Sequence, residues 1–238
     1  MHTIRRAVLV SATVAALSLP AVNAASAEPV SNGVTYAAAP ASIAGTSPDG
    51  LGTWSVHYQR IDGGQPNIAA AINDDLDAEA EAQVWQNTWD ASTTHRWTFE
   101  STGTLSFRPL TISALFVGEY DTDLPNMPFH TVATRVFDSR RGVLITWNNL
   151  FRDKQAGLTR LSEQTTAILP TIYTLPPSWR SGGETNPLDI NFKYWIPTAE
   201  GIELHFPDHQ FGRGLPVITV PWAKVADLIA PEFLPITE

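Results

Sequence analysis

The chain contains no cysteine among its 238 residues. This absence excludes disulfide bonds, thiolate nucleophiles, cysteine-ligated metals and a lipid-modified cysteine near the N-terminus. A chain of this length can bury about 70% of its unfolded surface in one domain. Eight tryptophans and ten phenylalanines supply large apolar side chains for that purpose. We therefore expect a hydrophobic core, and no covalent cross-link, to hold the fold together.

Basic residues are also scarce. The chain has 15 lysines and arginines against 24 aspartates and glutamates, so its formal net charge is −9. Charge of this sign repels both nucleic acid and anionic membrane surfaces, so we expect neither as a partner. It is compatible with a basic partner, and it is equally compatible with simple solubility.

A long apolar run occurs only once, at the N-terminus. Arg5 and Arg6 precede an apolar stretch over residues 7–22, and Ala-Ser-Ala at 25–27 is a small-residue cleavage site, with 22–24 as a second one. The pattern predicts a secretory signal peptide over residues 1–27. The run is short for a membrane span of about 20 residues. We expect a secreted or cell-envelope protein with no stable membrane insertion after cleavage.

The remaining chain divides into a leader and one folded region. Residues 28–50 are rich in Ala, Ser, Pro and Gly without periodicity, which predicts a flexible leader. Residues 51–238 are expected to form a single domain. Alternation of apolar and polar residues at 54–58 predicts a strand, whereas a four-residue apolar repeat from Asn67 to Asn87 predicts an amphipathic helix.

Strand patterns dominate the rest of the sequence. Residues 94–100 and 104–109 read as a hairpin with its turn at 101–103, and the apolar run 111–118 reads as a buried strand. Further strands are expected at 132–136, 143–145, 190–196 and 202–206, with helices at about 154–168 and 222–229. Runs of strands with few helices between them predict an α+β fold. We expect a mostly antiparallel twisted sheet, two principal helices packed on one side, and a short C-terminal helix.

Three segments, in this order, resemble the RsiV-like family of domains (DUF3298-type). They are the expected helix from Asn67 to Val84, the stretch Arg-Gly-Val-Leu-Ile-Thr-Trp-Asn-Asn-Leu-Phe at 141–151, and a closing pattern at 201–222. The closing pattern has a turn glycine before a strand, an aromatic-rich kink, a second glycine and Val-Pro-Trp. The resemblance covers about residues 51–230.

This resemblance implies a recognition domain outside the cell. The family includes membrane-anchored anti-sigma factors that bind lysozyme, secreted actinobacterial antigens of the MPT group, and domains attached to peptidoglycan deacetylases. An alanine-rich leader without cysteine makes the layout most similar to the secreted antigen group.

No catalytic motif is recognisable. The sequence has no Gly-x-Ser-x-Gly elbow, no phosphate loop and no His-Glu-x-x-His. His205 and His209 have the spacing of a helical metal-binding pair, but Pro207 between them forbids that helix. We therefore predict no catalytic residue, no metal and no cofactor, and lean towards a protein that is not an enzyme.

Carboxylates in the expected helix form two stripes. Asp74, Asp77 and Glu81 share one stripe, while Asp75 and Glu79 form a second. The stripes are interpreted as the solvated face of an amphipathic helix. The alternative is an acidic surface that steers a basic protein.

The leading hypothesis is a secreted, non-enzymatic recognition domain for a cell-surface or host protein, such as a basic protein like lysozyme. Its surface segments would be the polar loop Glu119–His130 and the connection Thr174–Asn186, because recognition usually lies on loops held by a rigid sheet. The alternative is a carbohydrate-binding or hydrolytic accessory of the cell envelope, which would use Glu203, His205, Asp208 and His209 with an exposed tryptophan. The aromatic residues considered as a sugar-stacking platform are Tyr58, Trp85, Trp89, Trp97, Trp179 and Trp195, although large aromatic side chains normally belong to the core. Trp179 is expected to be the most exposed of the tryptophans. The candidate binding residues are Glu119, Asp121, Asp123, His130, Trp179, Glu203, His205, Asp208 and His209.

Overall fold

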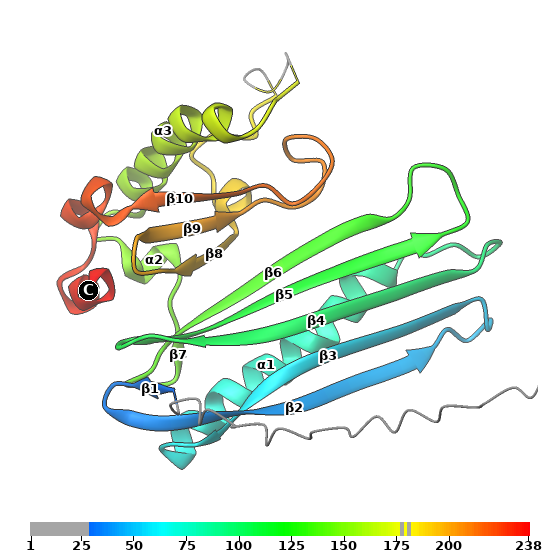
Figure 1. Cartoon of the computed structure of the whole chain (residues 1–238), viewed down its shortest axis with the longest axis horizontal. Helices are drawn as coiled ribbons and strands as arrows, with labels where there is room; N and C mark the ends of the chain where they lie inside the picture. Colours follow the sequence, from blue (N-terminus) through cyan, green and yellow to red (C-terminus); the bar gives the residue numbers. More distant parts are fainter. Residues whose placement is uncertain (1–28, 177–178, 180–181) are drawn as a thin grey trace, which may run out of the picture.

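A computed structural model describes residues 29–176, 179 and 182–238, and it contains two sheets (Figure 1). The large sheet has seven strands in sequence order: β1 (Val30–Ser31), β2 (Val34–Thr46), β3 (Gly52–Gly63), β4 (Trp97–Phe107), β5 (Thr111–Thr122), β6 (Phe129–Asp138) and β7 (Val143–Leu144). The small sheet has the order β10-β9-β8, with β8 at Tyr194–Pro197, β9 at Gly201–His205 and β10 at Val217–Pro221. All neighbouring pairs are antiparallel except β3 and β4. The predicted α+β class, with a mostly antiparallel sheet, is confirmed.

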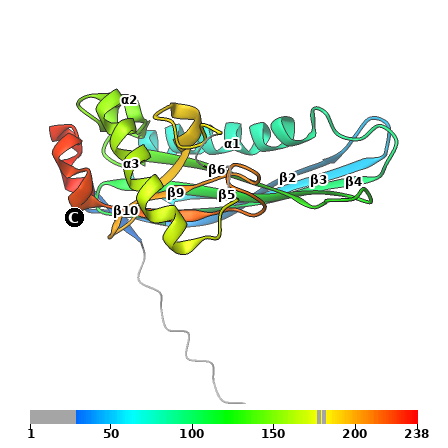
Figure 2. The same ribbon diagram turned by 90° about the horizontal axis from the view of Figure 1, so that it is seen from above.

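Helix α1 (Pro66–Thr88) makes the crossover between the parallel strands β3 and β4. Proline at the first helical position suits a helix start, because its ring presets φ and its missing N–H would have no partner there. The apolar repeat faces the sheet, and Ile72, Leu76 and Ala80 are fully buried against strand residues such as Phe99. Figure 2 shows α1 along one face of the large sheet. The predicted helix is confirmed.

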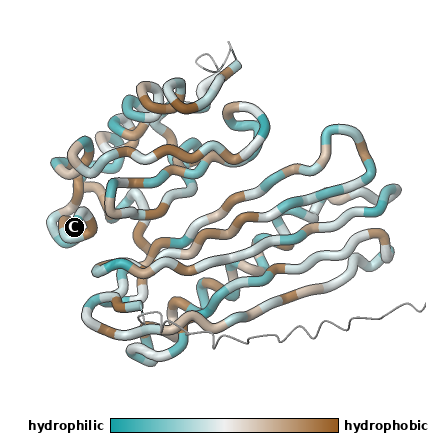
Figure 3. Tube along the Cα trace, in the orientation of Figure 1, coloured by the Kyte–Doolittle hydropathy of each residue, from teal (hydrophilic) through white to brown (hydrophobic). Residues whose placement is uncertain are grey.

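The small sheet packs against a different set of helices. These are α2 (Trp147–Leu150), α3 (Lys154–Ile172) and the 3₁₀ segments η1 (Asp189–Phe192), η2 (Trp222–Lys224), η3 (Ala226–Leu228) and η4 (Pro231–Thr237). Leu158 and Leu161 of α3 belong to one apolar cluster with Leu204 and Ile218 of the small sheet. Figure 3 shows the apolar segments of α3, β9 and β10 side by side. Each of the two principal helices thus covers its own sheet, and the expected closing helix at 222–229 is two short 3₁₀ turns.

Strand β8 joins the two sheets. The backbone N–H of Trp195 donates to the hydroxyl of Thr134 on β6 at 2.9 Å. The Trp195 ring stacks on Trp147, with 4.6 Å between centroids, and the indole N–H of Trp147 donates to the carbonyl of Phe192. Both tryptophans are buried, so they anchor the small sheet beside the end of the large one.

A flexible leader was predicted over residues 28–50, and the described part of it, residues 29–50, differs from that prediction. Strand β2 pairs with β3 over most of its length, from Tyr36 opposite Gly63 to Thr46 opposite Thr53. Most of its residues are small, and many of them are exposed, so the strand lacks the apolar alternation that marks a half-buried strand. Pairing with the long strand β3 decides its conformation, and local composition carries little signal for it.

The predicted hairpin turn at 101–103 is wrong, because β4 runs without interruption from Trp97 to Phe107. A Cβ atom added to Gly103 would lie 2.6 Å from the Phe116 ring on β5. The glycine is therefore needed for close packing of an aromatic ring and not for a turn. The expected strand 190–196 is also shorter, since residues 189–192 form η1 and β8 begins at Tyr194.

The acidic stripes of α1 are only partly solvated. The Glu79 side chain is 3% exposed and forms an ion pair with Arg135 of β6, so the expected solvated face is wrong at this residue. Asp77 accepts a hydrogen bond from the Tyr58 hydroxyl at 2.7 Å. Burial, reinforced by this carboxylate, raises the pKa of Tyr58 to about 12.

A second buried carboxylate closes the end of the large sheet. Asp138 at the end of β6 has no exposed side-chain surface and accepts hydrogen bonds from Nε of Arg140 and Nε of Arg141, both at 2.9 Å. Burial opposes ionisation, but the donors outweigh it and lower the pKa of Asp138 below its usual value. Within the described ranges no helix is long and apolar enough to cross a membrane, and the predicted signal peptide lies outside them.

We predict that Asp138→Asn lowers the free energy of unfolding by roughly 2 kcal/mol at pH 7, because two guanidinium groups lose a buried anion. Because the pKa of Asp138 is lower in the folded state, its ionisation stabilises the fold at pH values above its unfolded-state pKa of about 4. This stabilisation is lost as pH falls through the folded-state pKa. In urea titrations, the difference in the free energy of unfolding between wild type and variant should therefore become smaller below pH 4. The control Asp74→Asn, at an exposed position of α1, should change stability by under about 0.5 kcal/mol.

Candidate functional site

A cleft of about 660 Å³ opens where the C-terminal end of α1, the β5–β6 loop and the β9–β10 loop meet. We call it the tip cleft and define it by the lining residues Trp89, Tyr120, Leu124, Phe129 and His209. Its volume is typical of pockets that bind small molecules or segments of a larger ligand. Three segments far apart in the sequence contribute to it, so it is a product of the tertiary fold.

Two tryptophans at this end of α1 are strongly exposed. The Trp85 side chain is 69% exposed and Trp89 is 70% exposed, although most tryptophans are largely buried. They are four residues apart and therefore lie on the same side of the helix. Leu124 in the β5–β6 loop is also exposed. We call Trp85, Trp89 and Leu124 the tip surface.

The β9–β10 loop is held on the large sheet by Asp208. Its carboxylate is fully buried and accepts hydrogen bonds from the backbone N–H groups of His130 at 3.1 Å, His209 at 3.1 Å and Gly214 at 2.7 Å. Burial would raise the pKa of Asp208, but these donors and the His130 ring together lower it. The ionised carboxylate therefore fixes one wall of the tip cleft.

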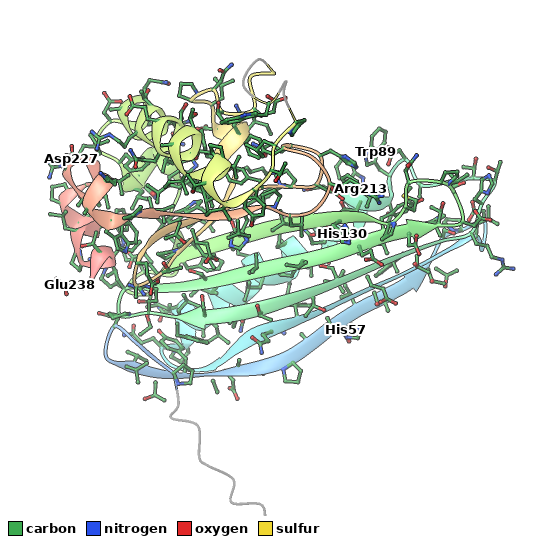
Figure 4. The ribbon with its side chains drawn as sticks, turned by 45° about the horizontal axis from the view of Figure 1, so that its top comes forward. His57, Trp89, His130, Arg213, Asp227 and Glu238 are labelled. Carbon is green, nitrogen blue, oxygen red and sulfur yellow. The ribbon has the colours of Figure 1, made fainter. Side chains whose placement is uncertain are left out.

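Further contacts connect the β9–β10 loop to the large sheet, and we call this region the junction. His130 Nδ1 lies 3.3 Å from Asp208, and its Nε2 lies 3.3 Å from Glu119, the residue opposite it on β5. Arg213 donates to the carbonyls of residues 126 and 128 at 3.1 and 3.0 Å, and the His209 ring stacks on Phe129 with 5.7 Å between centroids. Figure 4 shows Trp89, Arg213 and His130 close together in this region.

The structure brings together some of the sequence-predicted site residues. Glu119, His130, Asp208 and His209 meet at the junction, and of these His209 lines the tip cleft. Asp121 belongs to the end of β5, and Asp123 in the following loop forms a 2.8 Å ion pair with His95. Most of these contacts fall within the loop Glu119–His130 or touch it.

Other predicted site residues lie elsewhere. Glu203 and His205 form their own pair on β9, with 2.8 Å between Oε1 and Nε2, and His205 is buried. Trp179 was expected to be exposed, but it is half-buried and packs edge-on to Phe211. The connection Thr174–Asn186 lies partly outside the described residues. The expected set of Glu203, His205, Asp208 and His209 with an exposed Trp179 is therefore not gathered in one pocket.

Trp85 and Trp89 were considered for sugar stacking but were not included among the candidate binding residues, and Trp179 was expected to be the exposed tryptophan. The apolar repeat of α1 passes through Leu76, Ala80 and Val84, and the two tryptophans follow that register by one position. A shift of one residue rotates a side chain by about 100° on a helix. This offset predicts that both tryptophan side chains point away from the buried face of the helix.

The described residues include no group of three or more His, Asp or Glu side chains placed to hold a metal ion. The His130 cluster is instead a network of internal pairs that connects β5, β6 and the β9–β10 loop.

Comparison with known proteins places the fold. No family model matches the sequence, and no curated protein matches it either. A crystal structure of a DUF3298 family member from Bacteroides fragilis superposes with a TM-score of 0.58 at 8% identity, covering 87% of this chain and 98% of that one. A DUF3298 family protein from Pseudomonas aeruginosa superposes with a TM-score of 0.51 at 9% identity, covering 83% and 95%. The chain thus has the fold of a DUF3298-type domain, as its sequence resemblance predicted.

We predict that Asp208→Ala lowers the free energy of unfolding by roughly 2–3 kcal/mol, since it leaves buried N–H donors without an acceptor. Because the pKa of Asp208 is lowered, its contribution is present above pH 4 and lost as pH falls through the folded pKa. Hydrogen exchange should accelerate in residues 206–216. The control Asp123→Ala, whose side chain is 70% exposed, should change stability by less than about 1 kcal/mol. Equal losses in the two variants would contradict the anchoring role.

Proposed function

We propose that this protein is a recognition domain that binds a basic partner protein through the tip surface and the tip cleft. The observation that carries the proposal is the pair of tryptophans at the C-terminal end of α1: Trp85 and Trp89 are each about 70% exposed, and Trp89 lines the 660 Å³ cleft. An exposed Trp pair on a rigid helix is unfavourable in water and favourable once a partner covers it.

The chemistry of the tip surface fits a protein interface. Tryptophan is among the residues most enriched in binding hot spots, where truncation typically costs about 2–4 kcal/mol. Trp85 and Trp89 are displayed by a helix whose other face is locked into the core, so little order has to be gained on binding. Leu124 extends the apolar patch from the helix to the β5–β6 loop.

Charge around this end favours a basic partner. Glu81 lies one helical turn before Trp85 and is exposed, Asp90 lines the tip cleft, and Asp121 and Asp123 are on the adjoining strand end and loop. The whole chain has a net charge of −9. Carboxylates at the rim of an apolar patch accelerate encounter with a positively charged protein.

The predicted signal peptide and the DUF3298-type fold support recognition outside the cell, in a secreted or cell-envelope setting. The special similarity to the secreted antigen group stays a prediction. Lysozyme of the c-type is a suitable first probe, because it is a strongly basic protein and the sequence resemblance implies a partner of that kind.

We expect the purified chain to bind c-type lysozyme saturably at physiological salt, and Trp89→Ala to weaken binding about tenfold or more. Trp85→Ala should act in the same direction. Both side chains are exposed, so thermal unfolding should change little. The matched control is Ile190→Ala on η1, which removes an apolar side chain that is 68% exposed at another part of the surface.

Surface plasmon resonance at a series of salt concentrations would provide the measurement. No binding, or equal weakening by Ile190→Ala and Trp89→Ala, would sink the proposal for this partner. Binding that disappears between low and physiological salt would show charge attraction alone, without burial of the tryptophans.

Charge reversal tests whether the carboxylates beside the tip surface accelerate association with a basic partner. The double variant Asp121→Lys and Asp123→Lys should lower the association rate about tenfold at low salt and leave the dissociation rate nearly unchanged, since rim charges act mainly on encounter. The difference should shrink at high salt. A change confined to dissociation would place these carboxylates inside the interface instead.

A further inference from the structure

A second, smaller chamber of about 270 Å³ lies between α1 and β6. It shares Gln86, Asn87 and Phe129 with the tip cleft, so the two spaces adjoin. Gln83 and Thr131 line the chamber from opposite sides, the first on the helix and the second on the strand. Neither residue has a role in the tip surface.

Gln83 presents an unpaired acceptor. Its side chain is 2% exposed, and its Nε2 donates to Glu79 Oε1 at 2.6 Å. Because a carboxylate accepts from the amide nitrogen, the orientation of the amide follows from chemistry. Oε1 of Gln83 is buried and has no hydrogen-bond partner among the described residues.

Thr131 presents an unpaired hydroxyl. It is 6% exposed, and its Oγ1 also finds no partner in the described part of the chain. The residue opposite it on β5 is Gly118, and a Cβ atom there would lie 2.7 Å from Oγ1. Buried polar atoms in native proteins rarely lack a partner. Gln83 Oε1 accepts and the Thr131 hydroxyl both donates and accepts, so polar ligand groups at this chamber would supply partners that the described residues do not supply.

The charges around the chamber are already balanced. Glu79 is paired with Arg135, and His130, which also lines the chamber, lies between Asp208 and Glu119. A charged ligand would therefore meet no uncompensated partner there. The remaining walls include aromatic rings, with Tyr194 and Phe129 in the chamber and Trp89 and Tyr120 in the adjoining tip cleft.

We propose that the chamber and the tip cleft form a binding groove for a neutral oligosaccharide, with one sugar unit in the chamber. A sugar hydroxyl or acetamido group can donate to Gln83 Oε1 and accept from the Thr131 hydroxyl. The apolar faces of sugar rings pack on aromatic side chains, which continue from the chamber into the cleft. This site goes beyond protein recognition, because the partner protein of the tip surface needs neither buried oxygen.

The test is calorimetric titration of the purified chain, with ligand-observed NMR, using three probes. These are the β-1,4 trimer of N-acetylglucosamine, cellotriose, and a tri-alanine peptide whose amides also donate and accept. We expect saturable binding of at least one trisaccharide. The comparison between the two trisaccharides distinguishes an acetamido group from a hydroxyl group as the occupant of the chamber.

The decisive variant is Thr131→Val, which keeps the shape of the side chain and removes only the unpaired oxygen. It should weaken trisaccharide binding about tenfold. The melting temperature should stay the same or rise, because the variant removes a buried polar atom that has no hydrogen-bond partner. The matched control is Thr165→Val on α3, the helix that packs on the small sheet. Thr165 is also buried, and its Oγ1 has no hydrogen-bond partner among the described residues. This control should leave binding unchanged.

Tyr194→Ala is the second variant and should also weaken trisaccharide binding. Absence of saturable binding by either trisaccharide at millimolar concentration would overturn the proposal. So would equal affinity of wild type and Thr131→Val, because an ordered water would then satisfy both oxygens. Binding of tri-alanine alone would overturn the glycan class in favour of a peptide. Lysozyme binding by Thr131→Val should stay at the wild-type level, so the two proposals fail or succeed separately.

Discussion

The buried carboxylate of Asp208 is the interaction on which this end of the molecule depends. It accepts hydrogen bonds from backbone N–H groups of β6 and of its own loop, so an ionised group ties the β9–β10 loop of the small sheet to the large sheet at this end. Charge-assisted hydrogen bonds of this kind are stronger than neutral ones and have defined geometry. Without them, the β9–β10 loop would lack its main anchor, and His209 would not form a wall of the tip cleft.

The first turns of helix α1 pack in the core, whereas its last turns carry residues of the proposed binding sites. Its first turns bury Ile68, Ile72 and Leu76 in the core of the large sheet. Its last turns display Trp85 and Trp89 to solvent and contribute amide side chains to both spaces beside β6. The buried part makes the exposed part rigid, which lowers the entropy lost when a partner binds. A single element thereby positions both proposed binding surfaces.

The two proposed binding sites share the tip cleft, but their other parts bind by different interactions. The tip surface offers exposed apolar area with carboxylates around it, which suits a basic protein. The chamber offers two unpaired polar atoms in a small space with balanced charges, which suits a neutral ligand with hydroxyl or amide groups. Phe129 lines both spaces.

Local pattern alone determined α1 and the α+β class, because a four-residue apolar repeat and alternating strands leave a direct periodic signal. Strand β2 escaped prediction, since its small residues become a strand only through pairing with β3. Gly103 looked like a turn residue because its contact with the Phe116 ring is not visible in the sequence. His130 and Asp208 are 78 residues apart, and so their junction was decided by the tertiary structure alone. The same holds for the orphan oxygens of Gln83 and Thr131, because burial and missing partners are properties of packing and not of a sequence.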